Sequence, residues 1–195
     1  MKLNSADFQR GGFSPDDAKA VVCMLNECSV DLVELSGGSY EAPATLGQSR
    51  DGRTLAREAY FLEFAKDIAS VATMPLMVTG GIRRQAVAEE VLRSGLQMVG
   101  IATALALNPA LPKQWRQGQA ITPALRPVNW QSKPLVALAQ MAMVKHQLHR
   151  LGAGRRTNPE VAPWRALLGQ QIETFFRSRQ YRRTMKTSSS PAMGR

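Results

Sequence analysis

The sequence has little cysteine and no long apolar run. Its two cysteines, Cys23 and Cys28, fit neither a Cys-x-x-Cys redox pair nor a zinc knuckle. A disulfide framework is therefore excluded, and we expect free thiols in a reducing cytoplasm. The longest mostly apolar run, Met98 to Leu107, is about half as long as a membrane-spanning helix requires. No secretory signal is indicated at the N-terminus, so we expect a soluble, cytoplasmic protein with no membrane partner.

Acidic residues are scarce only in the last part of the chain. The 195 residues include 25 Lys and Arg against 15 Asp and Glu, a net charge of +10, which raises the question of a nucleic-acid partner. Residues 1–120 contain 12 basic and 13 acidic residues, whereas residues 121–195 contain 13 and 2. The excess of positive charge therefore lies in residues 121–195, and residues 1–120 carry almost no net charge.

The clearest single element is an early helix. Ser14 suits the N-cap, Pro15 suits the first helical position, and Asp17 lies where its charge meets the helix dipole. Apolar residues follow at helical spacing, which predicts a helix from Pro15 to Asn26. The same patterns predict the other elements, which are strands over 1–4, 30–35, 76–79 and 98–101 and helices over 57–72, 84–93, 135–151 and 163–176.

Strands and helices alternate over the first hundred residues. Short apolar strands joined to helices by short connections are typical of parallel βα units, so we predict an α/β fold with four parallel strands. Its fourth strand, over 98–101, is expected to be buried. Five prolines between 109 and 134 predict irregular structure there. The last residues, 177–195, read as a basic and flexible tail.

Two strand ends carry small residues that suit an anion. Thr79-Gly80-Gly81 leads from a strand into a helix, where backbone N–H groups are able to hold a phosphate. The next strand ends in Gly100 to Thr103, and in βα barrels the loops after the last two strands commonly form a phosphate site. The alternative is that these glycines only permit tight turns. Lys2, at the start of the first strand, faces either a partner or open solvent.

Several runs of the sequence together resemble the C-terminal half of the old yellow enzyme family, the FMN-dependent NADH:flavin oxidoreductases. The resemblance covers Lys2 to Pro112 in order. It implies the last four βα units of a (β/α)8 TIM barrel, followed by C-terminal helices. The chain would then comprise half of an FMN-binding barrel over 1–112, a Pro-rich connection with C-terminal helices over 113–176, and the tail. The runs that carry the resemblance are Lys2–Phe8, Gly11–Phe13, Asp31–Glu41, Val78–Arg83, Val99–Thr103 and Asn108–Pro112.

The resemblance also implies a cofactor and its contacts. Lys2 takes the place of a basic residue beside the flavin N1 and C2 carbonyl, where negative charge builds up on reduction. Gly80 and Gly81 take the place of the Gly-Gly whose amides hold the FMN phosphate. Ala102 and Thr103 stand where the family usually has Gly-Arg, which removes a charged phosphate contact. Either Arg83 or Arg84 compensates for that loss, or both are surface residues.

The implied activity is hydride transfer from NAD(P)H through FMN to an electrophilic alkene or enone-like small-molecule substrate. The family's substrate-anchoring residues come from the first four barrel strands, so no catalytic residue is named in this chain. We expect activity of this chain alone to be doubtful. Four strands leave open sheet edges, which favour self-association or pairing with a missing N-terminal half. Whether Met1 is the true start stays open. His146 and His149 are expected to be structural, with no metal.

Two other interpretations stay open. The first is a basic nucleic-acid-binding module acting through residues 121–195, in which Phe175, Phe176 and Tyr181 are interleaved with arginines. Against it, Phe175 and Phe176 are expected on the core face of their helix, and nucleic acid is not the expected partner. The second is a non-catalytic fragment that assembles with a partner through its open sheet edges.

Overall fold

The computed structural model describes residues 1–7, 10–37 and 58–188. The chain forms two compact units, Met1–Pro123 and Ala124–Arg195. Among the described residues no helix has both the length and the apolar character needed to cross a membrane.

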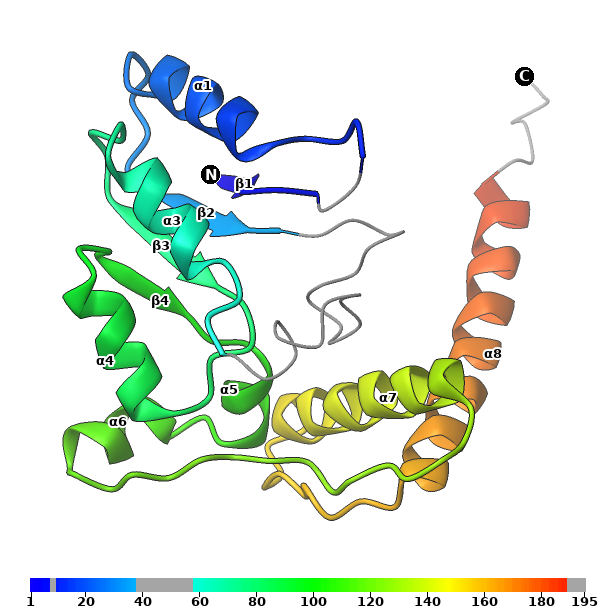
Figure 1. The fold of residues 1–195 in the computed structure, drawn as a ribbon. Coiled ribbons are helices and arrows are strands. Elements are labelled where there is room, and N and C mark those ends of the chain that lie inside the picture. Colours follow the sequence, from blue (N-terminus) through cyan, green and yellow to red (C-terminus); the bar gives the residue numbers. More distant parts are fainter. Residues whose placement is uncertain (8–9, 38–57, 189–195) are drawn as a thin grey trace, which may run out of the picture. The chain divides into compact units, whose positions relative to one another are not determined.

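The first unit is built on a parallel sheet, coloured blue to green in Figure 1. Its strands are β1 (Lys2–Asn4), β2 (Val33–Ser36), β3 (Leu76–Thr79) and β4 (Met98–Gly100), and they lie in the order β1-β2-β3-β4. All three pairings are parallel. This arrangement confirms the predicted α/β fold with four parallel strands, and it brings the carboxyl ends of all four strands to one edge of the sheet.

One face of the sheet is buried under helices. Figure 1 shows α1 (Pro15–Leu25), α3 (Leu62–Ala69) and α4 (Gln85–Arg93) along one side of the strands. Alternate strand residues face this side, because side chains alternate across a strand. They form a core with helix side chains such as Ile68 and Val91, both fully buried. The buried strand residues are Val33, Leu35, Leu76 and Val78.

The other face of the sheet is more polar. The register aligns Lys2 with Glu34, Glu34 with Met77, and Met77 with Met98 across the four strands. Met98 is 47% exposed, so the prediction of a buried fourth strand is wrong at this position. The side chain of Met98 lies on the face that the helices leave uncovered.

Helix α1 has the predicted start. The Ser14 hydroxyl accepts a hydrogen bond from the Asp17 N–H at 3.2 Å, and the Asp17 carboxylate accepts one from the Ser14 N–H at 2.9 Å. This reciprocal capping box satisfies two N–H groups that the helix cannot. The hydrogen bonds from the Ser14 side chain and backbone hold the pKa of Asp17 below its ordinary value.

Some predicted boundaries are wrong. Residues 58–61 form a turn before α3, whereas the sequence predicts helix from 57 onward. The Pro-rich segment is not wholly irregular, because α6 (Leu111–Arg116) follows α5 (Thr103–Leu107). Pro112 lies in the first turn of α6, where a missing N–H does no harm.

The second unit is a helical hairpin of α7 (Lys133–Gly152) and α8 (Pro163–Ser188). Helix α8 continues through Ser188, whereas the sequence predicts that it ends at Phe176 and that a flexible tail follows. Met143 is buried between the helices, and the Gln147 amide links α7 to Asn158 through both its donor and its acceptor. Phe175 and Phe176 are 63% and 62% exposed, so their predicted place on the core face is wrong.

Candidate functional site

The carboxyl ends of β3 and β4 bring the predicted phosphate residues side by side. Thr79 pairs with Gly100 in the sheet register, and the Thr79 hydroxyl donates to the Gly100 carbonyl at 3.1 Å. Gly80 and Gly81 directly follow β3, and Ala102 and Thr103 follow β4 two residues after its end. The two loops therefore leave the same edge of the sheet from adjacent strands.

Backbone N–H groups without partners gather in these two loops. In the described part of the chain, the N–H groups of Gly81 and Ile82 donate no hydrogen bond. The same is true of Thr103 and Ala104 at the start of α5, where the N-cap Ala102 has no side chain able to cap. Four such donors at one sheet edge suit an anion, because it is able to accept hydrogen bonds from them and no described side chain already does so.

Two aromatic rings press against the glycines of the β3 loop. Gly80 and Gly81 have φ of +127° and +70°, which side chains disfavour. A Cβ at Gly81 would lie 2.4 Å from Tyr60 Cζ, and a Cβ at Gly80 would lie 2.9 Å from the Phe61 ring. A side chain at either glycine would therefore have to displace an aromatic ring, in addition to adopting an unfavourable φ. The sequence analysis missed both aromatic residues as neighbours of this loop.

A buried carboxylate occupies the start of α4. Glu58 Oε2 accepts hydrogen bonds from the N–H groups of Arg83 and Arg84, both at 3.1 Å. Its Oε1 accepts from the Nε atoms of the same two arginines, both at 2.9 Å. The Glu58 side chain is 4% exposed. Glu58 thus binds the N–H groups of the two residues that precede α4, and among the described residues no side chain caps the first turn of the helix itself.

Lys2 lies on the same sheet but not beside the glycines. Its Nζ donates to Glu34 Oε1 at 2.5 Å, and its side chain is 59% exposed. The register places Lys2 level with Met77, three residues before Gly80 and two strands away. That offset corresponds to about 14 Å between the Cα atoms. The sequence analysis predicted the lysine but not the carboxylate that partly neutralises it.

Polar groups also line the ends of β1 and β2. The Ser36 hydroxyl donates to Asn4 Oδ1 at 3.3 Å, and Asn4 Nδ2 donates to Asp7 at 2.9 Å. Asp7 in turn accepts from the Phe13 N–H at 3.1 Å. The register pairs Asn4 with Ser36 between β1 and β2, and it pairs Thr79 with Gly100 between β3 and β4. Polar side chains therefore lie at the carboxyl ends of β1, β2 and β3.

The two histidines lie in the second unit, in a small hollow between α7 and α8. His149 Nδ1 lies 3.2 Å from Glu173 Oε2, and Arg177 binds the other oxygen of Glu173 at 2.6 Å. Burial lowers the pKa of His146, and the positive charges of Arg150 and His149 add to this effect. No group of three His, Cys, Asp or Glu residues in the described part of the chain is arranged to hold a metal ion.

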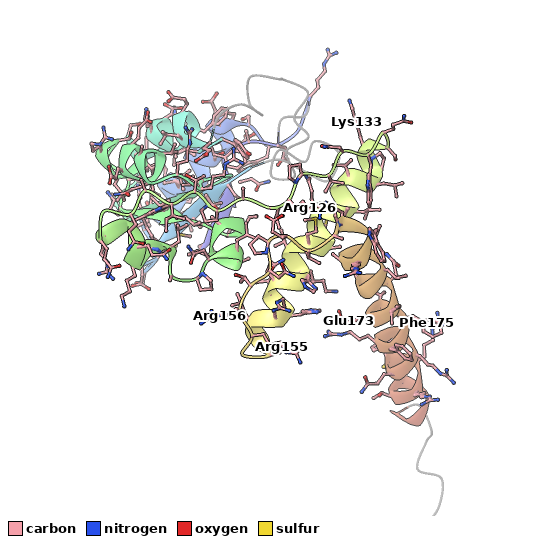
Figure 2. The ribbon with its side chains drawn as sticks, turned by 90° about the horizontal axis from the view of Figure 1, so that it is seen from below. Arg126, Lys133, Arg155, Arg156, Glu173 and Phe175 are labelled. Atoms are coloured by element: carbon pink, nitrogen blue, oxygen red, sulfur yellow. The ribbon has the colours of Figure 1, made fainter. Side chains whose placement is uncertain are left out.

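Basic side chains are spread over the helical hairpin. Figure 2 shows Lys133 at one end of α7 and Arg155 and Arg156 at the other, with Glu173 and Phe175 on α8. Arg150 is engaged in a hydrogen bond from Nε to the Arg156 carbonyl at 2.7 Å, and Arg165 lies over the Trp164 ring. The positive charge of this unit is therefore distributed along both helices.

Comparison with known proteins finds relatives that match more than half of this chain. The chain is 38% identical over 122 residues to the NADH-dependent flavin oxidoreductase iliE of Neonectria sp. (strain DH2), a match that covers 58% of this chain and 16% of that protein. It is 31% identical over 152 residues to the NADH-dependent flavin oxidoreductase nadA of Aspergillus parasiticus, covering 76% and 34%. The chain is similar to NADH-dependent flavin oxidoreductases. This confirms the resemblance drawn from the sequence.

A less similar relative and a family model complete the comparison. The NADH oxidase of Thermoanaerobacter brockii is 27% identical over 121 residues, covering 61% of this chain and 18% of that protein. The family model described as Histidine biosynthesis protein, a TIM-barrel family, matches residues 54–126. The four parallel strands thus correspond to part of a barrel, as predicted. The chain spans 16 to 34% of the lengths of these three relatives.

Proposed function

We propose that this chain forms the phosphate-binding side of an FMN-dependent oxidoreductase of the old yellow enzyme type. The observation that supports this most is the set of four unpartnered N–H groups, on Gly81, Ile82, Thr103 and Ala104, at the carboxyl edge of β3 and β4. Barrel enzymes carry their active sites on that edge, with phosphate sites in the loops after the last strands. The names of the relatives point to a flavin and NADH as the redox pair.

Each candidate residue has a definite part in this proposal. Gly80 and Gly81 turn the chain so that the N–H groups of Gly81 and Ile82 face the phosphate. Thr103 adds its N–H and one hydroxyl, and Ala102 leaves room for the phosphate. Lys2, two strands away and three residues before the level of Gly80, supplies a cation, shared with Glu34, toward the flavin ring.

The bound FMN would accept a hydride from NAD(P)H and pass it to an electrophilic alkene or enone-like small molecule. The residues of this chain would bind and orient that cofactor. No described residue is assigned a contact with the reacting atoms of the substrate. The further contacts would come from strands that pair with β1 and β4, each of which has one neighbouring strand among the described residues. We propose a second copy or an N-terminal barrel half as the source of those strands.

Flavin binding by the purified chain tests the proposal. Titration of the protein into FMN or riboflavin, followed by flavin fluorescence, compares two ligands that differ only in the phosphate. The proposal predicts that FMN binds at least 10-fold more tightly than riboflavin, because charge-assisted hydrogen bonds to the phosphate are lost in riboflavin. Equal affinity for the two flavins, or no binding of either, would contradict it.

A further inference from the structure

The segment that precedes α3 lies alongside the glycine turn. The Tyr60 N–H donates to the Gly80 carbonyl at 3.3 Å, the Tyr60 ring lies against Gly81, and Glu58 binds the N–H groups of Arg83 and Arg84. Because the partner numbers fall as the residue numbers rise, the two segments run in opposite directions. Ala59, between Glu58 and Tyr60, has φ of +56°, a backbone conformation that residues with a side chain rarely adopt. This backbone lets Glu58 and Tyr60 both reach the turn.

Glu58 holds two arginines on a single oxygen. Nε of Arg83 and Nε of Arg84 both donate to Oε1, so the two guanidinium groups lie next to each other despite their like charge. No Nη atom of either arginine has a partner in the described part of the chain. The two side chains are 60% and 56% exposed. Each guanidinium therefore keeps donors that face away from the buried carboxylate.

An ordinary surface ion pair does not explain this arrangement. An exposed pair of one cation and one anion contributes little to stability and leaves no net charge. Here one buried carboxylate, 4% exposed, is matched by two cations, so one positive charge is left over beside the Gly80–Gly81 turn. The opposing loop after β4 offers only Ala102 and Thr103, which are neutral. Among the described residues of these two loops, a phosphate dianion would find N–H donors in both but positive charge only on the β3 side.

We propose that Arg83 and Arg84, held side by side by Glu58, form the cationic part of the site and bind the phosphate monoester of the flavin. This inference rests on the proposed function and adds to it the residues that supply the charge. Arg83 follows Gly81 by two residues, so its Cα lies within about 7 Å of the glycine Cα. Planar guanidinium groups suit the tetrahedral phosphate because each is able to donate two parallel hydrogen bonds. Glu58 acts as a positioning residue that fixes where the two groups lie.

The test compares three variants of the full chain with the wild type. The double variant Arg83→Gln/Arg84→Gln removes both charges, and Arg83→Lys/Arg84→Lys keeps the charges but loses the planar fork. Arg93→Gln, in the last turn of the same helix α4, is the matched control. Equilibrium dialysis gives the affinity of each form for FMN and for riboflavin. We expect the glutamine pair to weaken FMN binding about 10- to 100-fold, the lysine pair to weaken it less, and riboflavin binding to stay unchanged in all forms.

A second readout separates this inference from the proposed function. Nε signals of Arg83 and Arg84 in a ¹⁵N NMR spectrum of the wild-type chain report directly on the guanidinium groups during titration with inorganic phosphate. Shifts that saturate, and that chloride at equal ionic strength does not reproduce, support the arginine site even if no flavin binds. Unshifted Nε signals overturn it. FMN binding that is equal in wild type and glutamine pair also overturns it while leaving the flavin proposal intact.

Discussion

The ring of Tyr60 fills the space in which a side chain at Gly81 would stand. An ideal Cβ at Gly81 would lie 2.4 Å from Tyr60 Cζ and 2.5 Å from its hydroxyl oxygen. The turn that is proposed to hold a phosphate is therefore shaped from outside by an aromatic side chain that comes from a segment 21 residues earlier. This contact makes the geometry of the turn testable by substitution.

Gly81→Ala is expected to destabilise the first unit by about 2–4 kcal/mol, since it combines a strained φ with a collision against Tyr60. Gly118→Ala is the matched control, because Gly118 has φ of +76° but open space around it, and it should cost only about 1 kcal/mol. Urea unfolding measures both. The double variant Gly81→Ala/Tyr60→Ala should recover part of the difference. Equal losses for the two alanine variants would show that the ring does not constrain the turn.

Glu58→Gln is expected to lower the free energy of unfolding by about 1–3 kcal/mol, because the buried carboxylate accepts four hydrogen bonds that the amide cannot all accept. Glu63→Gln is the control. Its side chain is 81% exposed and, among the described residues, is paired with Lys66, so its effect should stay within about 0.5 kcal/mol. Thermal or urea unfolding compares them. A loss of stability for Glu58→Gln no larger than that for Glu63→Gln would show that the hydrogen bonds of Glu58 to Arg83 and Arg84 do not stabilise the fold.

Acid weakens the start of α1. The pKa of Asp17 is lowered in the folded chain by the Ser14 hydrogen bonds. The unfolded chain therefore takes up the proton at higher pH than the folded chain does. The stabilising contribution of Asp17 is fully present above its ordinary pKa of 3.8 and is lost as the pH falls below it. Ser14→Ala should return the carboxyl pKa, measured by ¹³C NMR, toward 3.8, and an unchanged pKa would disprove the capping box as its cause.

The variant Lys2→Met tests whether Lys2 acts on the flavin ring or on the FMN phosphate. Because Lys2 is 59% exposed, loss of its pair with Glu34 should change stability by no more than about 1 kcal/mol. The proposed role toward the flavin ring predicts that FMN and riboflavin both bind about 5- to 10-fold more weakly, by the same factor. Fluorescence titration of both flavins measures this. A loss confined to FMN would place Lys2 at the phosphate instead.

Local signals made much of the first unit predictable. The predicted strand 76–79 is observed without change, and the predicted helix from Arg84 starts one residue later, at Gln85, because the signals for both elements lie within a few residues. The Pro15 helix follows its capping residues in the same way. These segments determine their own structure, and the parallel order of strands follows from their alternation with helices.

The partners within the site were not predictable in this way. Glu58 binds Arg83 and Arg84 from 25 and 26 residues away, and no pattern in the sequence indicates that pairing. Lys2 and Glu34 meet only because of the register between β1 and β2. Phe175 and Phe176 are apolar, which suggests burial, but α8 packs against α7 through a different face and leaves both rings exposed. Long-range pairing depends on how the elements pack, which spacing along one segment does not determine.

The central claim is that the N–H groups of Gly81, Ile82, Thr103 and Ala104 bind one phosphate. The most direct measurement is a ¹H–¹⁵N amide map of the full chain with FMN, and then with riboflavin at the same concentration. We expect these four amide signals to move together, with one affinity, on addition of FMN and to move much less with riboflavin. Signals that stay in place while FMN binds, or that move equally with both flavins, would contradict it.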